Sequence, residues 1–280
     1  MEDLKAWIGR TETATDLAAL SPLEGLAALL YHERPPWPAG EVPPLGHWLY
    51  FLPRAVQSQI TEDGHPARGG FLPPTPLPRR MWGGGRLTFH APIPVGATIE
   101  RRSTIADVSE KTGSTGPMVF VTVRHEVYAD GAHVLSEEHD IVYREASTSP
   151  TPPPGPAAAP PACDFAWTMQ TSIVQLFRFS ALTFNGHRIH YDRDYARDVE
   201  GYPGLIVHGP YLATLLMDHF LRRRPGAVVT RFEFRARRPV FDLAPFTLCL
   251  NDKGAGAELW VAGPDGETCM TATLEAANGL

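Results

Sequence analysis

Polar side chains suited to acid–base chemistry are concentrated between residues 185 and 209, where three of the 11 histidines fall within 22 positions. His190 follows Asn185 by five positions with Gly186 between them, a spacing that suits a turn from a loop into a helix better than one helix face. Imidazole is suited to general acid–base catalysis because its ordinary pKa lies near neutral pH. In such a turn, the Asn185 carboxamide and the His190 imidazole could converge on one water molecule.

A second chemical feature follows at Gly209-Pro210, where a helix is expected to begin. Proline is favourable at the first helical position because its missing N–H would have no partner there. The backbone amides of Gly209, Tyr211 and Leu212 are then expected to be free to bind an anion or a polarised carbonyl oxygen. A base, a water-positioning amide and an oxyanion site together suit the addition of water to an activated carbonyl compound, or its removal.

These residues resemble the hydratase motif of MaoC-like hotdog enzymes, and especially the hydroxyacyl-thioester dehydratase type 2 branch, which includes mesaconyl-CoA and itaconyl-CoA hydratases. The motif is the segment 184–190, Phe-Asn-Gly-His-Arg-Ile-His, followed by Ile-Val-His-Gly at 206–209. The resemblance covers most of the chain from about Arg79 onward. It implies a double hotdog that acts on enoyl thioesters of coenzyme A or acyl carrier protein without a metal or redox cofactor. Gly209 aligns with the glycine whose amide polarises the thioester carbonyl.

By the same resemblance, His190 aligns with the catalytic histidine of the family. Asn185 stands where the common motif has Asp, and a carboxamide can orient water or hold the imidazole but cannot exchange a proton. His190 is therefore expected to take the proton from water and return it at the α-carbon alone, or to share this work with His187, His208 or Asp192.

The residues next to these groups are expected to bind the substrate. If the substrate carries a second carboxylate, as mesaconyl and itaconyl thioesters do, the planar guanidinium of Arg188 suits its bidentate recognition. Phe184, His208 and Tyr211 complete the predicted substrate-binding set. His187 and His208 are also interpreted as hydrogen-bonding partners that fix the loop.

Other chemistries are less well supported by the spacing. A metal site of His187, His190, His208 and Asp192 is conceivable because imidazoles and a carboxylate suit zinc or iron, but the spacing matches no strong metal-binding motif. The three cysteines have no histidine or asparagine at a useful spacing and are assigned to packing.

The elements that must position these groups fall into two related halves. The pattern Arg-x-x-Phe-x4-Pro-Val begins at Arg86 and again at Arg231, and strand-like segments with an Asp-Gly turn follow each copy. In the first half, alternating apolar side chains predict strands over 118–128 and 134–143, joined at Asp130-Gly131. Duplication predicts, in each half, a helix followed by a strongly curved antiparallel sheet, which is an α+β fold.

The expected helices lie at 211–224 in the second half and at 22–31 in the first, and the latter is interpreted as the counterpart of the former. Apolar residues at helical spacing define the helix at 211–224. A capping box at 21–24, with proline at the first helical position, defines the helix at 22–31. The stretch from 33 to 80 is proline-rich with one apolar run at 47–52, and most of it is interpreted as a long irregular surface loop. The glycine run 83–85 is interpreted as a strand-entry turn, with an approach to a pantetheine arm as the alternative.

Composition bounds the remaining possibilities. The chain has 280 residues and a net charge of −6, so no basic field is available for nucleic acid. No stretch approaches the roughly 18 consecutive apolar residues of a membrane span. Three cysteines and an N-terminus without a signal pattern favour a cytoplasmic protein. The expected domains are an N-terminal degenerate hotdog half at 1–145, a proline-rich linker at 146–161 and a C-terminal catalytic half at 162–280.

The resulting prediction is a hydro-lyase that reversibly hydrates a 2,3-enoyl thioester to the 3-hydroxyacyl thioester. The expected acyl group is short or branched and dicarboxylic, such as mesaconyl-CoA or itaconyl-CoA. Two alternatives remain open: a hotdog acyl-CoA thioesterase, which would direct water at the thioester carbonyl, and a non-catalytic acyl-thioester binding subunit. One chain would equal the homodimer of single-hotdog relatives, and exposed sheet edges are compatible with a further homodimer.

Overall fold

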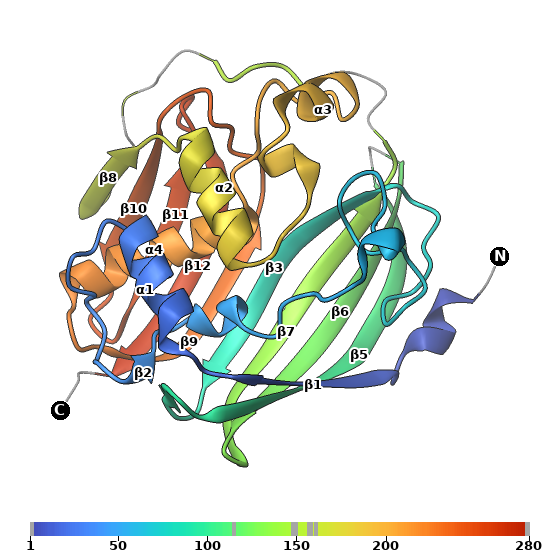
Figure 1. Ribbon diagram of the computed structural model, residues 1–280. Coiled ribbons are helices and arrows are strands. Elements are labelled where there is room, and N and C mark those ends of the chain that lie inside the picture. Colours follow the sequence, from blue (N-terminus) through green and yellow to red (C-terminus); the bar gives the residue numbers. More distant parts are fainter. Residues whose placement is uncertain (1–2, 114–115, 147–150, 156–158, 160–161, 278–280) are drawn as a thin grey trace.

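One ten-stranded antiparallel sheet runs through the whole molecule. The computed structural model describes residues 3–113, 116–146, 151–155, 159 and 162–277. The strand order is β1-β5-β6-β7-β3-β9-β12-β11-β10-β8, so each half of the chain contributes five neighbouring strands. Figure 1 shows the long strands of the first half beside the shorter strands of the second, with β3 and β9 at the junction.

The two halves contain their elements in a similar order. Those of the first half are η1 (Leu4–Trp7), β1 (Thr11–Leu17), α1 (Leu20–Leu29), β2 (Glu41–Val42), η2 (Gly46–Leu49), η3 (Gln57–Gln59), β3 (Arg79–Phe89), β4 (Ile93–Pro94), β5 (Thr98–Gly113), β6 (Gly116–Ala129) and β7 (Ala132–Arg144). Those of the second half are β8 (Phe165–Met169), α2 (Ile173–Leu182), η4 (Arg188–His190), α3 (Arg193–Asp198), α4 (Gly209–Arg223), β9 (Val228–Ala236), β10 (Phe246–Asp252), β11 (Gly256–Ala262) and β12 (Thr268–Ala277).

The junction between the halves lies on an approximate two-fold axis. Leu87 of β3 stands directly opposite Phe232 of β9, and the sequence repeat makes these two positions equivalent. Gly84 lies in the middle of β3, where a Cβ atom would come within 2.5 Å of the Phe234 carbonyl oxygen. The glycine run is therefore part of a strand that needs close approach of a neighbouring backbone, and its interpretation as a strand-entry turn is wrong.

Helix α4 forms the centre of the second half. Every residue from Tyr211 to Leu221 is buried, because the helix packs against β10, β11 and β12. It begins at Gly209 with Pro210 in the first turn, which confirms the helix predicted over 211–224 within two residues. The strands predicted over 118–128 and 134–143 are also confirmed, as parts of β6 and β7.

Helix α1 differs from the prediction in its start, its end and its counterpart. Its N-cap is Ala19 without a side-chain hydrogen bond, so the capping box at 21–24 is wrong. The helix ends before Tyr31, which has a left-handed φ of 61°, and α2 ends in the same way at Phe184 with a φ of 48°. Each of these helices directly follows an edge strand, β1 or β8, so the counterpart of α1 is α2 rather than α4.

The stretch from 33 to 80 is irregular as expected, but part of it belongs to the core. Leu45, Leu49, Tyr50 and Phe51 are buried. In the first half, η2 and the residues after it precede β3 where α4 precedes β9 in the second. This part includes most of the apolar run at 47–52, which the sequence sets apart from the surface loop, and it covers a sheet face that has no equivalent of α4 among the described residues.

The predicted linker at 146–161 lies largely outside the described residues. Within its described part, residues 151–155 have no regular secondary structure, and the Thr151 amide donates a hydrogen bond to the Gly201 carbonyl oxygen at 2.7 Å. No helix of the described chain is long and apolar enough to cross a membrane.

Candidate active site

A cavity of about 950 Å³ is lined by residues of both halves. The first half contributes residues between 47 and 66 and inward side chains of β3, β5, β6 and β7. The second half contributes the turn after α2, η4, the start of α4 and the end of β9. Asn185, His190 and Gly209, the three predicted catalytic residues, all line this cavity.

His190 is held as a neutral base. It lies buried at the end of η4, and its Nδ1 donates a hydrogen bond to the Ile206 carbonyl oxygen at 2.8 Å. Because a carbonyl oxygen can only accept, the proton of the neutral ring is on Nδ1 and Nε2 carries the lone pair. Burial, with a smaller effect of His187, lowers the pKa of His190 to about 3. The imidazole is therefore ready to accept a proton at neutral pH.

His208 supports His190 from behind. The two rings stack with their centroids 3.6 Å apart and an angle of 19° between their planes. His208 is fully buried, its Nε2 is 2.8 Å from the Ser180 hydroxyl, and burial lowers its pKa well below the ordinary value. It does not line the cavity, so the prediction that it binds substrate is corrected to a supporting position between α2 and the start of α4.

Tyr211 also lies behind the cavity wall. Its side chain is fully buried and stacks on Phe179 with centroids 4.8 Å apart. It points into the core because it lies in the first turn of α4, on the side that faces α2. The prediction that Tyr211 contacts substrate is corrected in the same way.

Asn185 is positioned by the turn that ends α2. Phe184 takes the left-handed conformation, which lets the Asn185 amide bond back to the Ser180 carbonyl oxygen at 2.8 Å. The Asn185 Oδ1 accepts a hydrogen bond from the His187 amide at 3.0 Å. Its Nδ2 has no hydrogen-bond partner among the described residues and is available to a water molecule or substrate. Phe184, predicted to bind substrate, is 62% exposed and lines the cavity.

Gly209 presents its backbone amide at the start of α4. This amide has no acceptor in the described part of the chain, and a Cβ atom built on Gly209 would meet no heavy atom within 4 Å. The expectation that the Leu212 amide is also free is wrong, because it donates to the His208 carbonyl oxygen at 3.0 Å. The Tyr211 amide has no acceptor among the described residues either, but Tyr211 does not line the cavity, so the oxyanion position predicted here rests on the Gly209 N–H at the positive end of the helix.

Arg188 already has partners in the structure. Its Nε and Nη2 donate to the Asp192 carboxylate at 3.0 and 2.8 Å, and its guanidinium lies over the Tyr195 ring. Asp192 also caps α3 through the Tyr195 amide, and this hydrogen bond and the Arg188 contact lower its pKa. Asp192 does not line the cavity and is held by these contacts, which leaves it poorly placed to share acid–base work with His190.

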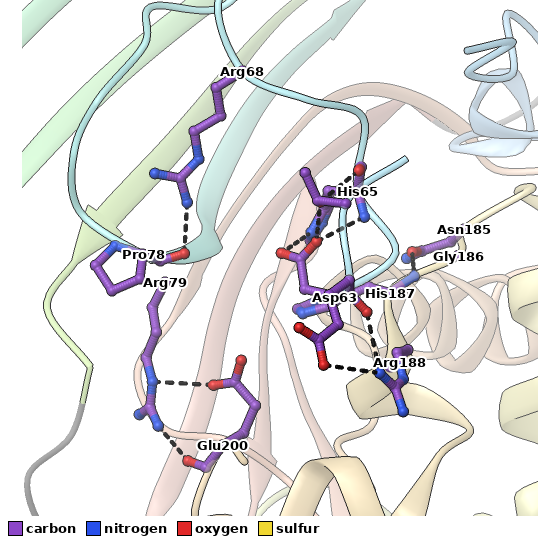
Figure 2. A network of polar contacts seen from close by, with 12 residues as sticks. Asp63, His65, Arg68, Pro78, Arg79, Asn185, Gly186, His187, Arg188 and Glu200 are labelled. Atoms are coloured by element: carbon purple, nitrogen blue, oxygen red, sulfur yellow. Dashed lines mark hydrogen bonds and ion pairs between the residues drawn. The ribbon is translucent and has the colours of Figure 1, made fainter. Parts of the chain in front are cut away.

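A segment of the first half that was not predicted from the sequence packs on the catalytic turn. Figure 2 shows Asp63 and His65 beside His187. The Arg188 amide donates to the Asp63 carbonyl oxygen at 2.9 Å, and the His65 and His187 rings are 4.2 Å apart. His65 Nδ1 is 3.0 Å from the Asp63 carboxylate. The sequence Asp-Gly-His-Pro at 63–66 signals a turn, but nothing in it shows what the turn contacts.

The metal-ligand set proposed from the sequence is not assembled in the described residues. His190 Nδ1 and His208 Nε2 are taken by hydrogen bonds to Ile206 and Ser180. The side chains whose ligand atoms lie within 4.8 Å of one another are Asp63, His65 and His187. A direct hydrogen bond between Asp63 and His65 accounts for part of this closeness.

The sequence of the chain is similar to those of acyl-thioester hydratases and dehydratases. The family model described as hydroxyacyl-thioester dehydratase type 2 matches residues 45–242. The chain is 48% identical over 277 residues to a mesaconyl-C(4)-CoA hydratase of Chloroflexus aurantiacus, and the match covers 98% of each chain. It is 28% identical to a mitochondrial hydroxyacyl-thioester dehydratase type 2 of Schizosaccharomyces pombe over 77% of this chain and 78% of the other.

Solved structures share the fold at low sequence identity. A MaoC-like dehydratase superposes with a TM-score of 0.73 at 14% identity and covers 99% of this chain and 100% of its own. HtdX of Mycobacterium tuberculosis gives a TM-score of 0.67 at 20% identity, covering 96% and 100%. A further M. tuberculosis protein described as having a double hotdog fold gives 0.58 at 14% identity, covering 96% of each chain. The predicted α+β double hotdog is thereby confirmed.

Proposed function

The chain belongs to the hydroxyacyl-thioester dehydratase type 2 family, and on this premise we propose that it reversibly hydrates a short dicarboxylic 2,3-enoyl-CoA of the mesaconyl or itaconyl type. Its class of activity is that of an enoyl-thioester hydratase and 3-hydroxyacyl-thioester dehydratase. The observation that carries the proposal is the neutral His190, with Nε2 unprotonated, on the wall of a cavity that Asn185 and the Gly209 amide also line.

In the proposed mechanism, one imidazole moves one proton in each direction. A water molecule held by Asn185 Nδ2 gives a proton to His190 Nε2 while its oxygen bonds to the β-carbon. The electron pair of the double bond moves towards the thioester, where the Gly209 N–H donates a hydrogen bond to the oxygen that gains negative charge. The His190 imidazolium then returns its proton to the α-carbon, and the dehydration runs through the same steps in reverse.

The environment of His190 favours this rapid return. Its Nδ1 donates to a backbone carbonyl oxygen rather than to a carboxylate, so no negative charge pairs directly with the imidazolium. A buried charged imidazole without a partner is costly, and protonation of the α-carbon removes that cost.

The dicarboxylic substrate class is supported by the 48% identical relative. That protein is named for a mesaconyl thioester at C4, in which a carboxylate and a methyl group are both bound to the carbon β to the thioester. Phe184 and Arg188 line the cavity and are proposed to contact the acyl-CoA, whereas His208 and Tyr211 support the residues that do.

The test is an enoyl-thioester absorbance assay with mesaconyl-C4-CoA, itaconyl-CoA and crotonyl-CoA, run with a thiol indicator. We expect loss of the enoyl signal without thiol release, and a decrease of kcat by about 10² to 10⁴-fold in His190→Gln. His90→Gln is the control, because His90 is exposed and does not line the cavity. Thiol release would instead indicate the thioesterase, and binding of the thioesters without turnover would indicate a binding subunit.

A further inference from the structure

The inward face of the first-half sheet carries polar side chains in the middle of an otherwise apolar surface. Ser103 of β5, His125 of β6 and Glu137 of β7 stand opposite one another across three neighbouring strands. Arg101 is the neighbouring inward-facing residue before Ser103 on β5, and His139 is the neighbouring inward-facing residue after Glu137 on β7. Burying such groups is costly unless each finds a partner, so each of them calls for an explanation.

Glu137 has its partners within the protein. Its two carboxylate oxygens are 3.0 Å from His47 Nε2 and 3.0 Å from Trp48 Nε1. Burial raises the pKa of Glu137, but the hydrogen bond to His47 and the nearby imidazoles outweigh it and lower this pKa to about 2. Glu137 therefore holds the segment at 47–48 against the sheet, and its carboxylate is already hydrogen-bonded to that segment.

His139 lacks such partners. It lines the cavity and stacks on Trp82 with ring centroids 3.8 Å apart, and neither ring nitrogen has a hydrogen-bond partner among the described residues. Burial lowers its pKa to about 3, so the ring is neutral and carries one N–H donor. This donor is available to a ligand in the cavity.

Arg80 is a cation on the same face without an ion pair. Arg80 stands opposite Tyr143 and Trp82 opposite Ile141, which places both on the inward face of β3. Arg80 is half-buried and lines the cavity. Among the described residues its guanidinium has no hydrogen bond and no salt bridge, whereas Arg188 pairs with Asp192.

Arg80 acts electrostatically both on the catalytic turn and on the polar residues of the first half. Burial is the main cause of the lowered pKa of both His187 and His139, and the positive charge of Arg80 contributes to each. His187 is next to His190, with ring centroids 5.5 Å apart. Arg101, by contrast, lies against Phe51 and acts electrostatically on Glu137.

Other residues fix the chain before and after Arg80, which lies at the start of β3. Arg68 donates hydrogen bonds to the carbonyl oxygens of Thr75, Leu77 and Pro78 at 2.7, 2.5 and 2.6 Å. The buried Arg79 forms an ion pair with the half-buried Glu200 of the second half, with Nε and Oε2 3.1 Å apart, as Figure 2 shows. The backbone that carries Arg80 is thus preorganised, which reduces the entropy lost when a ligand binds.

We propose that Arg80, with the N–H of His139, binds the carboxylate next to the reacting carbon of a dicarboxylic enoyl-CoA and thereby selects dicarboxylic over monocarboxylic substrates. The inference rests on the proposed function. When the carboxylate is on the β-carbon, its cation must stand beside the catalytic turn. Arg80, Arg144 and Arg237 line the cavity without an ion pair among the described residues, and Arg80 is the one of these three whose charge acts on His187. A guanidinium and a carboxylate form two parallel hydrogen bonds, which also orient the double bond.

The test distinguishes binding of the carboxylate from binding of the rest of the acyl-CoA. Succinyl-CoA carries a carboxylate on its β-carbon where butyryl-CoA carries a methyl group, and neither has a double bond to hydrate. We expect Arg80→Met to weaken competitive inhibition by succinyl-CoA about 100-fold and inhibition by butyryl-CoA less than about 3-fold. Arg80→Lys keeps the charge but loses the paired hydrogen bonds and should give an intermediate loss for succinyl-CoA. Arg124→Met is the matched control, because Arg124 is exposed on β6 and does not line the cavity.

Turnover provides the second readout. The ratio of kcat/KM for mesaconyl-C4-CoA to that for crotonyl-CoA should decrease by about the same factor in Arg80→Met, while its thermal unfolding remains cooperative. Equal losses for both inhibitors would overturn the proposal and assign Arg80 to the CoA portion. Loss of discrimination in Arg188→Met but not in Arg80→Met would move the carboxylate site to Arg188. If the wild-type protein hydrates no enoyl-CoA, the proposed function fails, and direct binding of the saturated pair still tests Arg80.

Discussion

At the scale of single residues, the protonation state of His190 decides which steps the site can perform. Because its pKa is lowered to about 3, the neutral base persists well below the pH at which an ordinary histidine becomes charged. We therefore expect kcat/KM of the wild-type protein to show no acid limb between pH 8 and pH 5.5. A pH profile measured with mesaconyl-C4-CoA checks this, and an acid limb centred near pH 6.5 would contradict it.

Replacing Asn185 by Asp should move this limb upwards. A carboxylate close to His190 stabilises the imidazolium, so the pKa of His190 rises and the base becomes protonated at higher pH. In Asn185→Asp, the acid limb of kcat/KM should therefore appear at a higher pH than in the wild-type protein, by about 1 to 3 pH units. Asn185→Ala is the control, since it also loses the Nδ2 donor but adds no charge. The same limb in both variants would mean that charge at position 185 does not act on His190.

The residues of the catalytic turn could be named from the sequence because their chemistry is local. Asn185, His190 and Gly209 lie within 25 positions, and the turn, η4 and the start of α4 bring them to one cavity. Arg80, His139 and the pair Asp63 and His65 come from other strands and loops. Which of them reach the cavity depends on strand register and on the packing of the 61–65 segment, neither of which a local pattern specifies.

At the scale of elements, the difference between the halves creates the site. Helix α4 fills the inner face of the second-half sheet, whereas the first half has only η2 and an irregular segment in the corresponding position. Inward side chains of β5, β6 and β7 consequently line the cavity. Helices α1 and α4 both have apolar residues at helical spacing, and this shared pattern is why the sequence predicts α1 as the counterpart of α4. Only the position after an edge strand and the shared left-handed end show that α1 corresponds to α2.

The contact between Gly64 and Gly186 should be essential for the docking of the 61–65 segment. A Cβ atom on Gly64 would lie 1.8 Å from the Gly186 carbonyl oxygen, and the φ of Gly64 is +93°. Gly64→Ala should therefore displace the segment from the catalytic turn and lower kcat/KM by at least about 10-fold. Gly96→Ala is a matched control, because its φ is +91° but a Cβ there meets nothing within 4 Å. Equal effects of the two substitutions on kcat/KM would show that backbone strain, rather than docking, is responsible.

At the scale of the whole molecule, the sheet is continuous across both halves and ends at β1 and β8. A homodimer through these edges stays a prediction, which the mass in solution would test. Burial keeps several histidines of the core and of the cavity wall neutral. Burial lowers the pKa to about 3 in His139, His187 and His190 and to about 4 in His125, and lowers it well below the ordinary value in His208.

These buried histidines predict that the fold is sensitive to mild acid. In the unfolded chain each has a pKa of about 6.5, so between pH 6.5 and pH 4 the unfolded state binds protons that the folded state does not. The free energy of unfolding is therefore highest above pH 6.5 and decreases as the pH falls, by up to about 1.4 kcal/mol per pH unit for each histidine. Urea unfolding at pH 7.5, 6.5 and 5.5 should give a free energy of unfolding that decreases by more than the protonation of a single histidine can explain. His125→Gln, which can keep a hydrogen bond to Ser103, should make this decrease smaller by about one proton. A free energy of unfolding that stays constant down to pH 5.5 would mean that the folded state also binds these protons. This result would contradict the neutral state of His190 on which the mechanism depends.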